Sequence, residues 1–115
     1  MNQVVQYQAT LDRTFGALSD PSRRAIVERL GRGSAPVSEL AELLGMTLTG
    51  TKKHVQVLEA AGLVTTEKVG RTRFCRLGPR RLEDELGWIE TYRMHLDERL
   101  DRFGELLAQR KGNLA

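Results

Sequence analysis

The chain has 115 residues, which is enough for one domain with its own core but too few for two. The net charge is +3, but the segment 52–81 has eight lysines and arginines against two glutamates, a charge of +6 that leaves −3 for the other residues. Such a concentration of positive charge favours a polyanionic partner. No stretch approaches 18 apolar residues, no signal-peptide pattern opens the chain, and Cys75 is the single cysteine, so we expect a cytosolic protein without membrane contact, disulfide or thiolate cluster.

Two helices are predicted in the N-terminal part. Over residues 4–18, apolar side chains recur at helical spacing at Val4, Leu11, Phe15 and Leu18. The run Ser19-Asp20-Pro21 then supplies an N-cap followed by proline at the first helical position, which predicts a second helix up to Gly31. Arg23 and Arg24 near its start oppose the helix dipole, so we expect a carboxylate or phosphate partner for them.

A helix-turn-helix is predicted next. Ser38 is expected to cap a short helix over 39–44 that Gly45 terminates, and Thr47 to cap a helix from about 48 to 61 that Gly62 ends. Only two residues separate the short helix from the second cap, which is the usual spacing of a helix-turn-helix. At 100° per residue, the buried face of the longer helix comprises Leu48, Thr51, Val55 and Leu58.

The opposite face of the 48–61 helix is short, polar and cationic. It presents Thr49, Lys53 and Gln56, flanked by Gly50 and Lys52. Threonine and glutamine can hydrogen-bond base edges in the major groove, lysine can reach a phosphate or a guanine, and glycine allows close backbone approach. We interpret this face as a DNA-binding surface; a solvated polar face without a ligand is the alternative.

Two β-prone runs surround Gly70 and Arg71 and predict a hairpin over about 64–77, of the kind called a wing. Its tip has Lys68, Arg71 and Arg73, which beside a DNA-binding helix would meet phosphate or the minor groove. Cationic residues that protect a sheet edge against pairing are the alternative explanation. Cys75 is expected to point into the core.

A long helix is predicted from about 81 to 110. Apolar residues recur every seven positions along it, and a stripe of about 40 Å, at 1.5 Å per residue, exceeds what one small domain can cover. We therefore predict a two-fold dimer in which this helix and the first helix bury the seam, with two DNA-binding helices facing half-sites one or two turns apart. The predicted interface residues are Leu11, Phe15, Leu86, Ile89, Leu96, Leu100 and Phe103.

The order of these elements and three local strings resemble the ArsR/SmtB family of dimeric winged-helix repressors. The strings lie at residues 17–27, 53–64 and 70–77. The resemblance implies a mainly α-helical winged helix-turn-helix of five helices and a two-stranded wing, forming a single domain over 1–115. It also implies a dimer that occludes a promoter. By position, it implies DNA contacts from Thr47, Thr49, Gly50, Lys52, Lys53, His54 and Gln56 in the helix and from Arg71 and Arg73 in the wing.

The metal sites of that family do not carry over. One requires Cys-x-Cys before the turn, where residues 35–40 contain no cysteine, and of the other only His95-Leu-Asp-Glu98 remains, which is half a site. The run Trp88-Ile-Glu-Thr-Tyr-Arg93 is similar to the tail of a metal-independent branch often encoded beside START-like proteins. We expect no metal or other cofactor, and a small-molecule effector stays unidentified.

No catalytic constellation is present, so we do not expect an enzyme. The sequence indicates a DNA-binding transcriptional regulator, a dimeric repressor of a palindromic operator. Two alternatives stay open: a winged-helix module that binds an acidic protein, and a metal-responsive repressor with a rearranged site from His95, Asp97 and Glu98. His54 either donates to DNA or supports the helix from a half-buried position.

Overall fold

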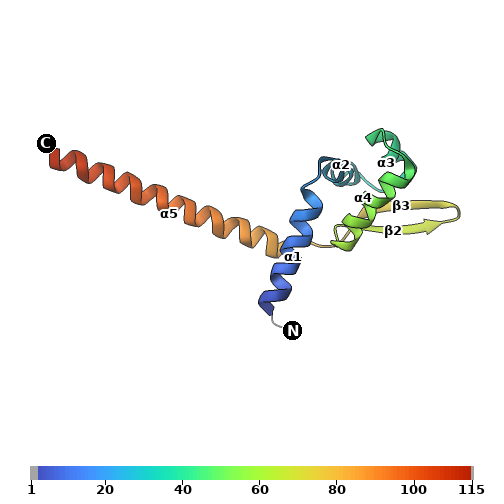
Figure 1. Cartoon of the computed structure of the whole chain (residues 1–115), viewed down its shortest axis with the longest axis horizontal. Helices are drawn as coiled ribbons and strands as arrows, with labels where there is room; N and C mark the ends of the chain where they lie inside the picture. Colours follow the sequence, from blue (N-terminus) through green and yellow to red (C-terminus); the bar gives the residue numbers. More distant parts are fainter. Residues whose placement is uncertain (1–2, 115) are drawn as a thin grey trace. The chain divides into compact units, whose positions relative to one another are not determined.

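The computed structural model describes residues 3–114, which form five helices and a three-stranded antiparallel sheet (Figure 1). The chain divides into two compact units, with the boundary between Arg81 and Leu82. The helices are α1 (Gln3–Leu18), α2 (Pro21–Leu30), α3 (Val37–Leu44), α4 (Leu48–Ala60) and α5 (Glu83–Leu114). The strands are β1 (Ala35–Pro36), β2 (Val64–Val69) and β3 (Thr72–Leu77), in the sheet order β1-β3-β2.

The predicted N-caps of α2 and α4 are confirmed. Asp20 accepts hydrogen bonds from the backbone N–H groups of Ser22 at 2.8 Å and Arg23 at 3.2 Å. Thr47 accepts one from the N–H of Gly50 at 3.0 Å. Each cap satisfies backbone donors that have no partner within the first turn of a helix. The two capping residues, Asp20 and Thr47, therefore set where α2 and α4 begin.

The predicted glycine stops are confirmed as well. Gly45 has φ +62° after α3, and Gly62 has φ +74° after α4, a left-handed conformation that glycine adopts without strain. After α4, the N–H of Leu63 donates to the carbonyl oxygen of Leu58 at 3.0 Å, and the N–H of Gly62 donates to the backbone carbonyl oxygen of Glu59 at 2.9 Å. This pair of bonds is a Schellman motif, which turns the chain directly from α4 into β2.

The start of α3 differs from the prediction. The helix begins at Val37 with Pro36 at its N-cap and no side-chain cap, so Ser38 lies inside the first turn and is not the cap. The reason is non-local, because Ala35 and Pro36 pair with Cys75 and Phe74 of β3 and hold the chain extended until the helix starts. The same pairing makes the sheet three-stranded, where the sequence predicted two strands.

The two arginines of α2 bond backbone carbonyl groups of this chain, a kind of partner that the sequence did not predict. Arg23 donates to the carbonyl oxygens of Ala17 at 2.7 Å and Gly16 at 3.2 Å, and Arg24 donates to that of Leu18 at 2.8 Å. The last carbonyls of a helix lack intrahelical partners and form its negative end. The end of α1 therefore supplies a negative partner for both arginines, and Arg23 also interacts with the Asp20 carboxylate, whereas a phosphate partner stays a prediction.

The core of the first unit lies between α2, α3, α4 and the sheet. One large side chain from each element is fully buried, and the set comprises Ile26, Leu40, Leu58, Val64 and Cys75. Burial of such an apolar side chain contributes roughly 1.5–3 kcal/mol. On α4, Thr51, Val55 and Leu58 are buried as predicted, so α4 is anchored on one side only.

Leu48 was predicted to belong to that buried face, and this is wrong, since its side chain is 45% exposed. It is the first residue of α4 and follows Met46 and Thr47, which are exposed too. The helical stripe of the sequence continues to residue 48, but the packing begins only at Thr51. Leu48 is therefore an apolar residue on the outer surface at the N-terminal end of α4.

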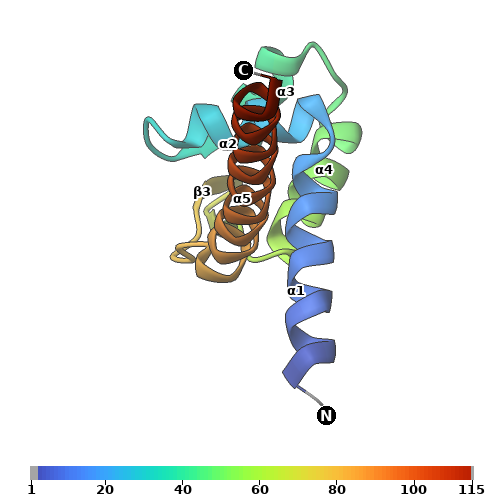
Figure 2. The ribbon, with the colours of Figure 1, turned by 90° about the vertical axis from the view of Figure 1, so that its left-hand side faces the viewer.

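The second unit comprises the single helix α5, which is continuous when seen from the side in Figure 1 and is viewed nearly along its axis in Figure 2. Its 32 residues correspond to roughly 48 Å at 1.5 Å per residue. Many of its apolar side chains are exposed, among them Leu86, Ile89, Met94, Leu96, Leu100, Phe103, Leu106 and Leu107. Among the described residues, no helix is long and apolar enough to cross a membrane.

Candidate nucleic-acid interface

The outward face of α4 has the residues predicted for DNA contact. Thr47, Thr49, Lys52, Lys53 and Gln56 are exposed, whereas Gly50 and His54 are half-buried at its edges. The buried opposite face holds the helix against the core. Hydroxyl, amide and ammonium groups thus extend from a rigid element, which is the arrangement that base-edge recognition requires.

The local structure also explains why position 50 is a glycine. A Cβ atom at this position would lie 3.1 Å from the hydroxyl oxygen of Thr47, the oxygen that accepts the N–H of Gly50. Any larger residue would crowd the cap of α4. The close backbone approach predicted for Gly50 and the integrity of the cap therefore depend on the same missing side chain.

His54 is held from the side by α2. Its Nδ1 lies 3.3 Å from Nη1 of Arg23, the arginine that also bonds the end of α1. Because a guanidinium only donates, Nδ1 must accept, and the ring proton is then on Nε2. His54 therefore supports the position of α4, and in this tautomer its Nε2–H is the donor that the ring can offer to a ligand.

Asp20 belongs to the same neighbourhood. Its partial desolvation alone would raise the carboxyl pKa, but hydrogen bonds from the N–H groups of Arg23 and Ser22, with the nearby Arg23 charge, lower the pKa on balance. Asp20 therefore stays ionised at the positive end of α2, where its charge is favourable. This cap fixes the turn of chain from which Arg23 extends.

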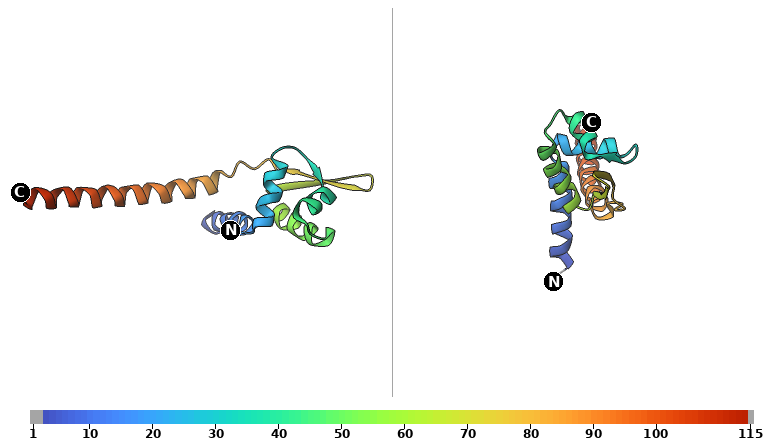
Figure 3. Two further views of the ribbon diagram at one scale, coloured as in Figure 1. Left: turned by 90° about the horizontal axis from the view of Figure 1, so that it is seen from above. Right: turned by 90° about the vertical axis from the view of Figure 1, so that its right-hand side faces the viewer.

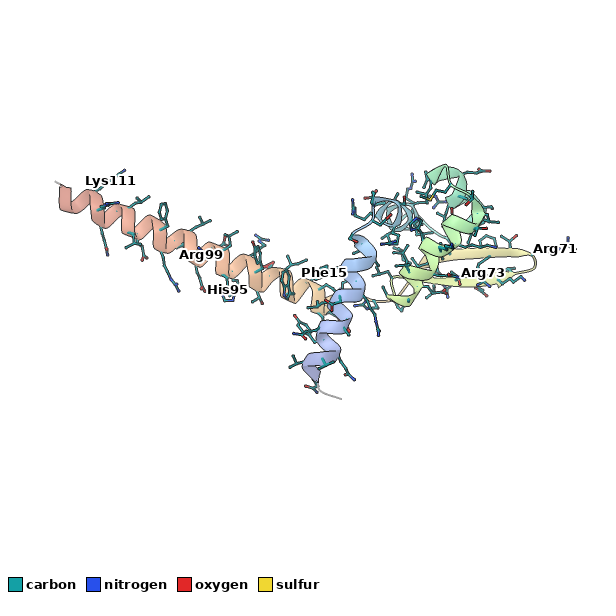
Figure 4. All side chains as sticks on the ribbon, viewed as in Figure 1. Phe15, Arg71, Arg73, His95, Arg99 and Lys111 are labelled. Atoms are coloured by element: carbon teal, nitrogen blue, oxygen red, sulfur yellow. The ribbon has the colours of Figure 1, made fainter. Side chains whose placement is uncertain are left out.

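The wing is a hairpin that extends beyond α3 and α4 (Figure 3). Val69 pairs with Thr72 across a two-residue turn, and Gly70 takes the positive φ of +63° that such a turn needs at its first position. Arg71 lies at the tip, and Arg73 lies further back along β3 (Figure 4). Both arginines are exposed, as a contact with DNA requires.

Lys68 lies directly opposite Arg73 in the β2–β3 register. Directly paired residues project from the same face of a sheet, and like charges in such a pair are destabilising unless an anion compensates them. The sequence places Lys68 with Arg71 and Arg73 at the wing tip, among the cations expected to meet phosphate or the minor groove. Its pairing with Arg73 depends on the register, which the sequence analysis had not predicted.

One hydrogen bond ties the wing to α4 and a second joins the two strands of the wing, and sequence reasoning found neither. Thr66 of β2 donates its hydroxyl to Glu59 Oε2 at 2.8 Å, and Arg73 Nη1 donates to the Thr66 hydroxyl oxygen at 3.0 Å. A groove of about 310 Å³ lies here between helix and wing. Its lining comprises Val37, Lys52, Val55, Gln56, Glu59, Thr66 and Arg73.

Cys75 lies in the core, as predicted. Burial raises the pKa of its thiol, nearby Glu59 raises it further, and Arg73 opposes the shift only in part. The thiol therefore stays protonated and has little nucleophilic character. No group of three or more histidine, cysteine, aspartate or glutamate side chains suited to a metal occurs in the part of the chain that the structure describes.

The residues predicted for the dimer interface divide into two kinds. Leu11 is 7% exposed and already buried within this chain. The others are exposed and comprise Phe15, Leu86, Ile89, Leu96, Leu100 and Phe103. On α5, a shallow apolar groove is lined by Leu96, Leu100, Phe103 and Leu106 with Arg99 and Arg102 at its sides. His95 and Arg99 project from the same side of this helix (Figure 4).

Comparison with known families places the similarity in the helical part of the first unit. Residues 18–67 match a family described as a helix-turn-helix domain. The chain is 43% identical over 68 residues to the HTH-type transcriptional regulator Rv2034 of Mycobacterium tuberculosis, an overlap of 59% of this chain and 64% of that protein. The chain therefore spans slightly less than two thirds of the length of this curated relative.

Two solved structures are similar over most of their length. An ArsR-like transcriptional regulator from Rhodococcus sp. RHA1 is 32% identical with a TM-score of 0.74, covering 94% of this chain and 98% of that one. A crystal structure of an ArsR family transcriptional regulator is 35% identical with a TM-score of 0.70, covering 84% of this chain and 97% of that one. The similarity thus includes both fold and sequence.

Proposed function

Since the chain belongs to the ArsR family of winged helix-turn-helix transcriptional regulators, we propose that it is a homodimeric repressor that binds a palindromic operator. The observation that carries the proposal is the two-sided character of α4. One side is buried in the core, and the other presents Thr49, Lys53 and Gln56 to solvent. A helix anchored in this way can enter the major groove without losing its own packing.

In the proposed complex, the exposed side of α4 approaches the base edges. Lys53 and Gln56 supply donors and an acceptor for direct contacts, and Gly50 allows the backbone to come close. Leu48, exposed at the start of the helix, adds an apolar group that can meet a thymine methyl. Thr47 and Thr49 flank it, so the surface combines polar and apolar recognition.

The wing contributes affinity and orientation. Arg71 at its tip and Arg73 on β3 are assigned to phosphates or the minor groove, and Lys68 joins Arg73 on the same face. Such contacts release counterions and do not depend on base sequence. Lys52 at the edge of α4 is assigned the same role, whereas His54 contacts DNA through Nε2 in the tautomer fixed by Arg23.

The dimer follows from α5. Its exposed apolar residues form a continuous surface along most of the helix. An apolar surface of this size on a protein usually marks a site of association. A second copy of the same helix offers a complementary apolar surface, and a two-fold dimer has two α4 helices, one for each half-site of a palindromic operator. The proposed seam includes Leu86, Ile89, Leu96, Leu100 and Phe103 with Phe15 from α1, whereas Leu11 is already buried within its own chain.

The proposed action is occupancy of a promoter and includes no chemical step on a substrate. Repression then depends on the fraction of operator sites bound, so affinity and specificity are the quantities that matter. A repressor acts where genomic DNA lies, which places the proposed activity in the cytoplasm of a prokaryotic cell.

The test is selection of genomic fragments by the purified full chain, followed by binding measurements on the enriched sequence and on a random duplex. We expect the enriched duplex to bind about 10³-fold or more tightly than the random one. The logarithm of the binding constant should fall linearly with the logarithm of salt concentration. Equal affinity for both duplexes would refute the repressor and favour the alternative of an acidic protein partner.

A further inference from the structure

Three side chains link the wing to α4 in one hydrogen-bonded chain. Glu59 is on the exposed side of α4, Thr66 is on β2 and Arg73 is on β3. The distances are 2.8 Å from the Thr66 hydroxyl to Glu59 Oε2 and 3.0 Å from Arg73 Nη1 to the Thr66 hydroxyl oxygen. Thr66 is thus the single side chain that contacts both neighbours.

The direction of this chain is determined by the chemistry of its ends. An ionised carboxylate only accepts and a guanidinium only donates, whereas a hydroxyl does both. Thr66 must therefore give its proton to Glu59 and offer its oxygen to Arg73. Both bonds involve a charged partner, which makes them stronger than bonds between neutral groups.

Arg73 is held at the border of the groove between helix and wing. Lys52 lines the same groove from α4, and Lys68 is opposite Arg73 on the wing. Two cations, Lys52 and Arg73, therefore line a groove with room for a small anion, while Glu59 is engaged by Thr66. The anion that the proposed function brings to this place is a phosphate of the DNA backbone.

We propose that Thr66 is a positioning residue: it orients Arg73 through the bond to Glu59, so that wing and α4 present Arg73 and Lys52 together to one backbone phosphate. This inference rests on the proposed DNA binding and adds the residue that couples the two contact elements. Thr66 itself touches no DNA in this account. Its effect is to hold a flexible cationic side chain in one orientation before binding.

The experiment compares Thr66→Val, Thr66→Ser, Arg73→Ala and the double variant Thr66→Val/Arg73→Ala on the selected duplex over a salt series. Valine keeps the β-branched shape but removes both hydrogen bonds, and serine keeps the hydroxyl. We expect Thr66→Val to weaken binding about 3- to 10-fold with an unchanged salt slope. Arg73→Ala should lower the salt slope by about one phosphate contact, and Thr66→Ser should restore wild-type affinity.

The double variant distinguishes positioning from a separate effect. If Thr66 acts through Arg73, Thr66→Val causes no further loss in the Arg73→Ala background. Additive losses, wild-type affinity of Thr66→Val, or failure of serine to restore binding would each overturn the inference. If Arg73→Ala itself left binding unchanged, the proposed wing contact would fail, which is a different result.

A second pair of variants avoids any change in the sheet. Glu59→Gln and Glu59→Ala both remove the negative charge, but only glutamine keeps an oxygen that can accept from Thr66. We expect Glu59→Ala to bind the duplex about 3-fold more weakly than Glu59→Gln. Equal affinities would contradict the positioning chain even if a Thr66 variant proved unstable.

Discussion

The helices α4 and α5 both expose a long face, but they differ in what the rest of the chain provides for them. α4 buries Thr51, Val55 and Leu58 in its own core and exposes polar and cationic groups. α5 exposes leucine, isoleucine and phenylalanine over most of its length. α4 is anchored in its own core and presents cations to solvent, whereas α5 presents an apolar face to solvent. One chain thus has two surfaces that require different kinds of partner.

The largest effect is expected from placing charges on the apolar face of α5. The double variant Leu100→Glu/Phe103→Glu should convert the proposed dimer into a monomer, because an interface would have to bury two unpaired carboxylates. Sedimentation equilibrium measures the association state. Operator affinity should fall at least about 100-fold, since the second half-site no longer adds to binding.

The matched control for this variant is Glu105→Gln, a charge change at an exposed residue of the same helix. It should leave the association state unchanged. If the doubly substituted chain remained dimeric, the assignment of α5 as the dimer interface would be wrong, and its apolar face would need another explanation.

The buried side of α4 should be the next most sensitive. Leu58→Ala removes a fully buried side chain and should lower the free energy of unfolding by about 2–5 kcal/mol. Val57→Ala, one residue away but exposed, should change it by less than about 0.5 kcal/mol. Urea unfolding of the two variants measures the contrast. Equal losses would mean that α4 is not anchored on one side only.

A smaller effect is expected at Leu48. If its side chain meets a thymine methyl, replacing that thymine by deoxyuridine should weaken binding about 4-fold, the equivalent of roughly 0.8 kcal/mol for one buried carbon. The Leu48→Ala variant should bind both duplexes alike. A scan of deoxyuridine across each thymine of the operator locates the contact. If no deoxyuridine replacement weakened binding, Leu48 would not contact a thymine methyl group.

These differences follow from what a local pattern can and cannot specify. Thr47, Asp20 and Gly62 act on residues within a few positions, so caps and stops could be predicted from the sequence. The early start of α3 depends on pairing between Pro36 and β3, and the exposure of Leu48 depends on where packing against the core begins. Local patterns contain neither kind of information.

The candidate site shows the same division. The cationic character of α4 and of the wing is visible in the sequence, because it follows from residue type. The Thr66 link and the opposition of Lys68 to Arg73 required the register of β2 on β3. Arg23 illustrates a further limit, since backbone carbonyls of α1 were not considered as its partners although they form a negative helix end.

The smallest expected effect is on the pH dependence of folding stability at acidic pH. The pKa of Asp20 is lowered from its ordinary value of 3.8, so its ionised form stabilises the fold above that pH, and this contribution is lost as the pH falls through the lowered pKa. Asparagine also caps helices but cannot ionise. The stability difference between wild type and Asp20→Asn should therefore be constant from pH 5 to 7 and shrink below about pH 4. A difference independent of pH would contradict this.

The most direct measurement of the central claim is competition between the selected operator and a random duplex for three proteins. Wild type should prefer the operator, and Lys53→Ala/Gln56→Ala should lose about 10-fold or more of that preference, because the exposed face of α4 contacts bases. Arg71→Ala should weaken binding to both duplexes alike and reduce the salt slope. If the α4 variant kept the full preference of the wild type, α4 would not be the DNA-reading helix.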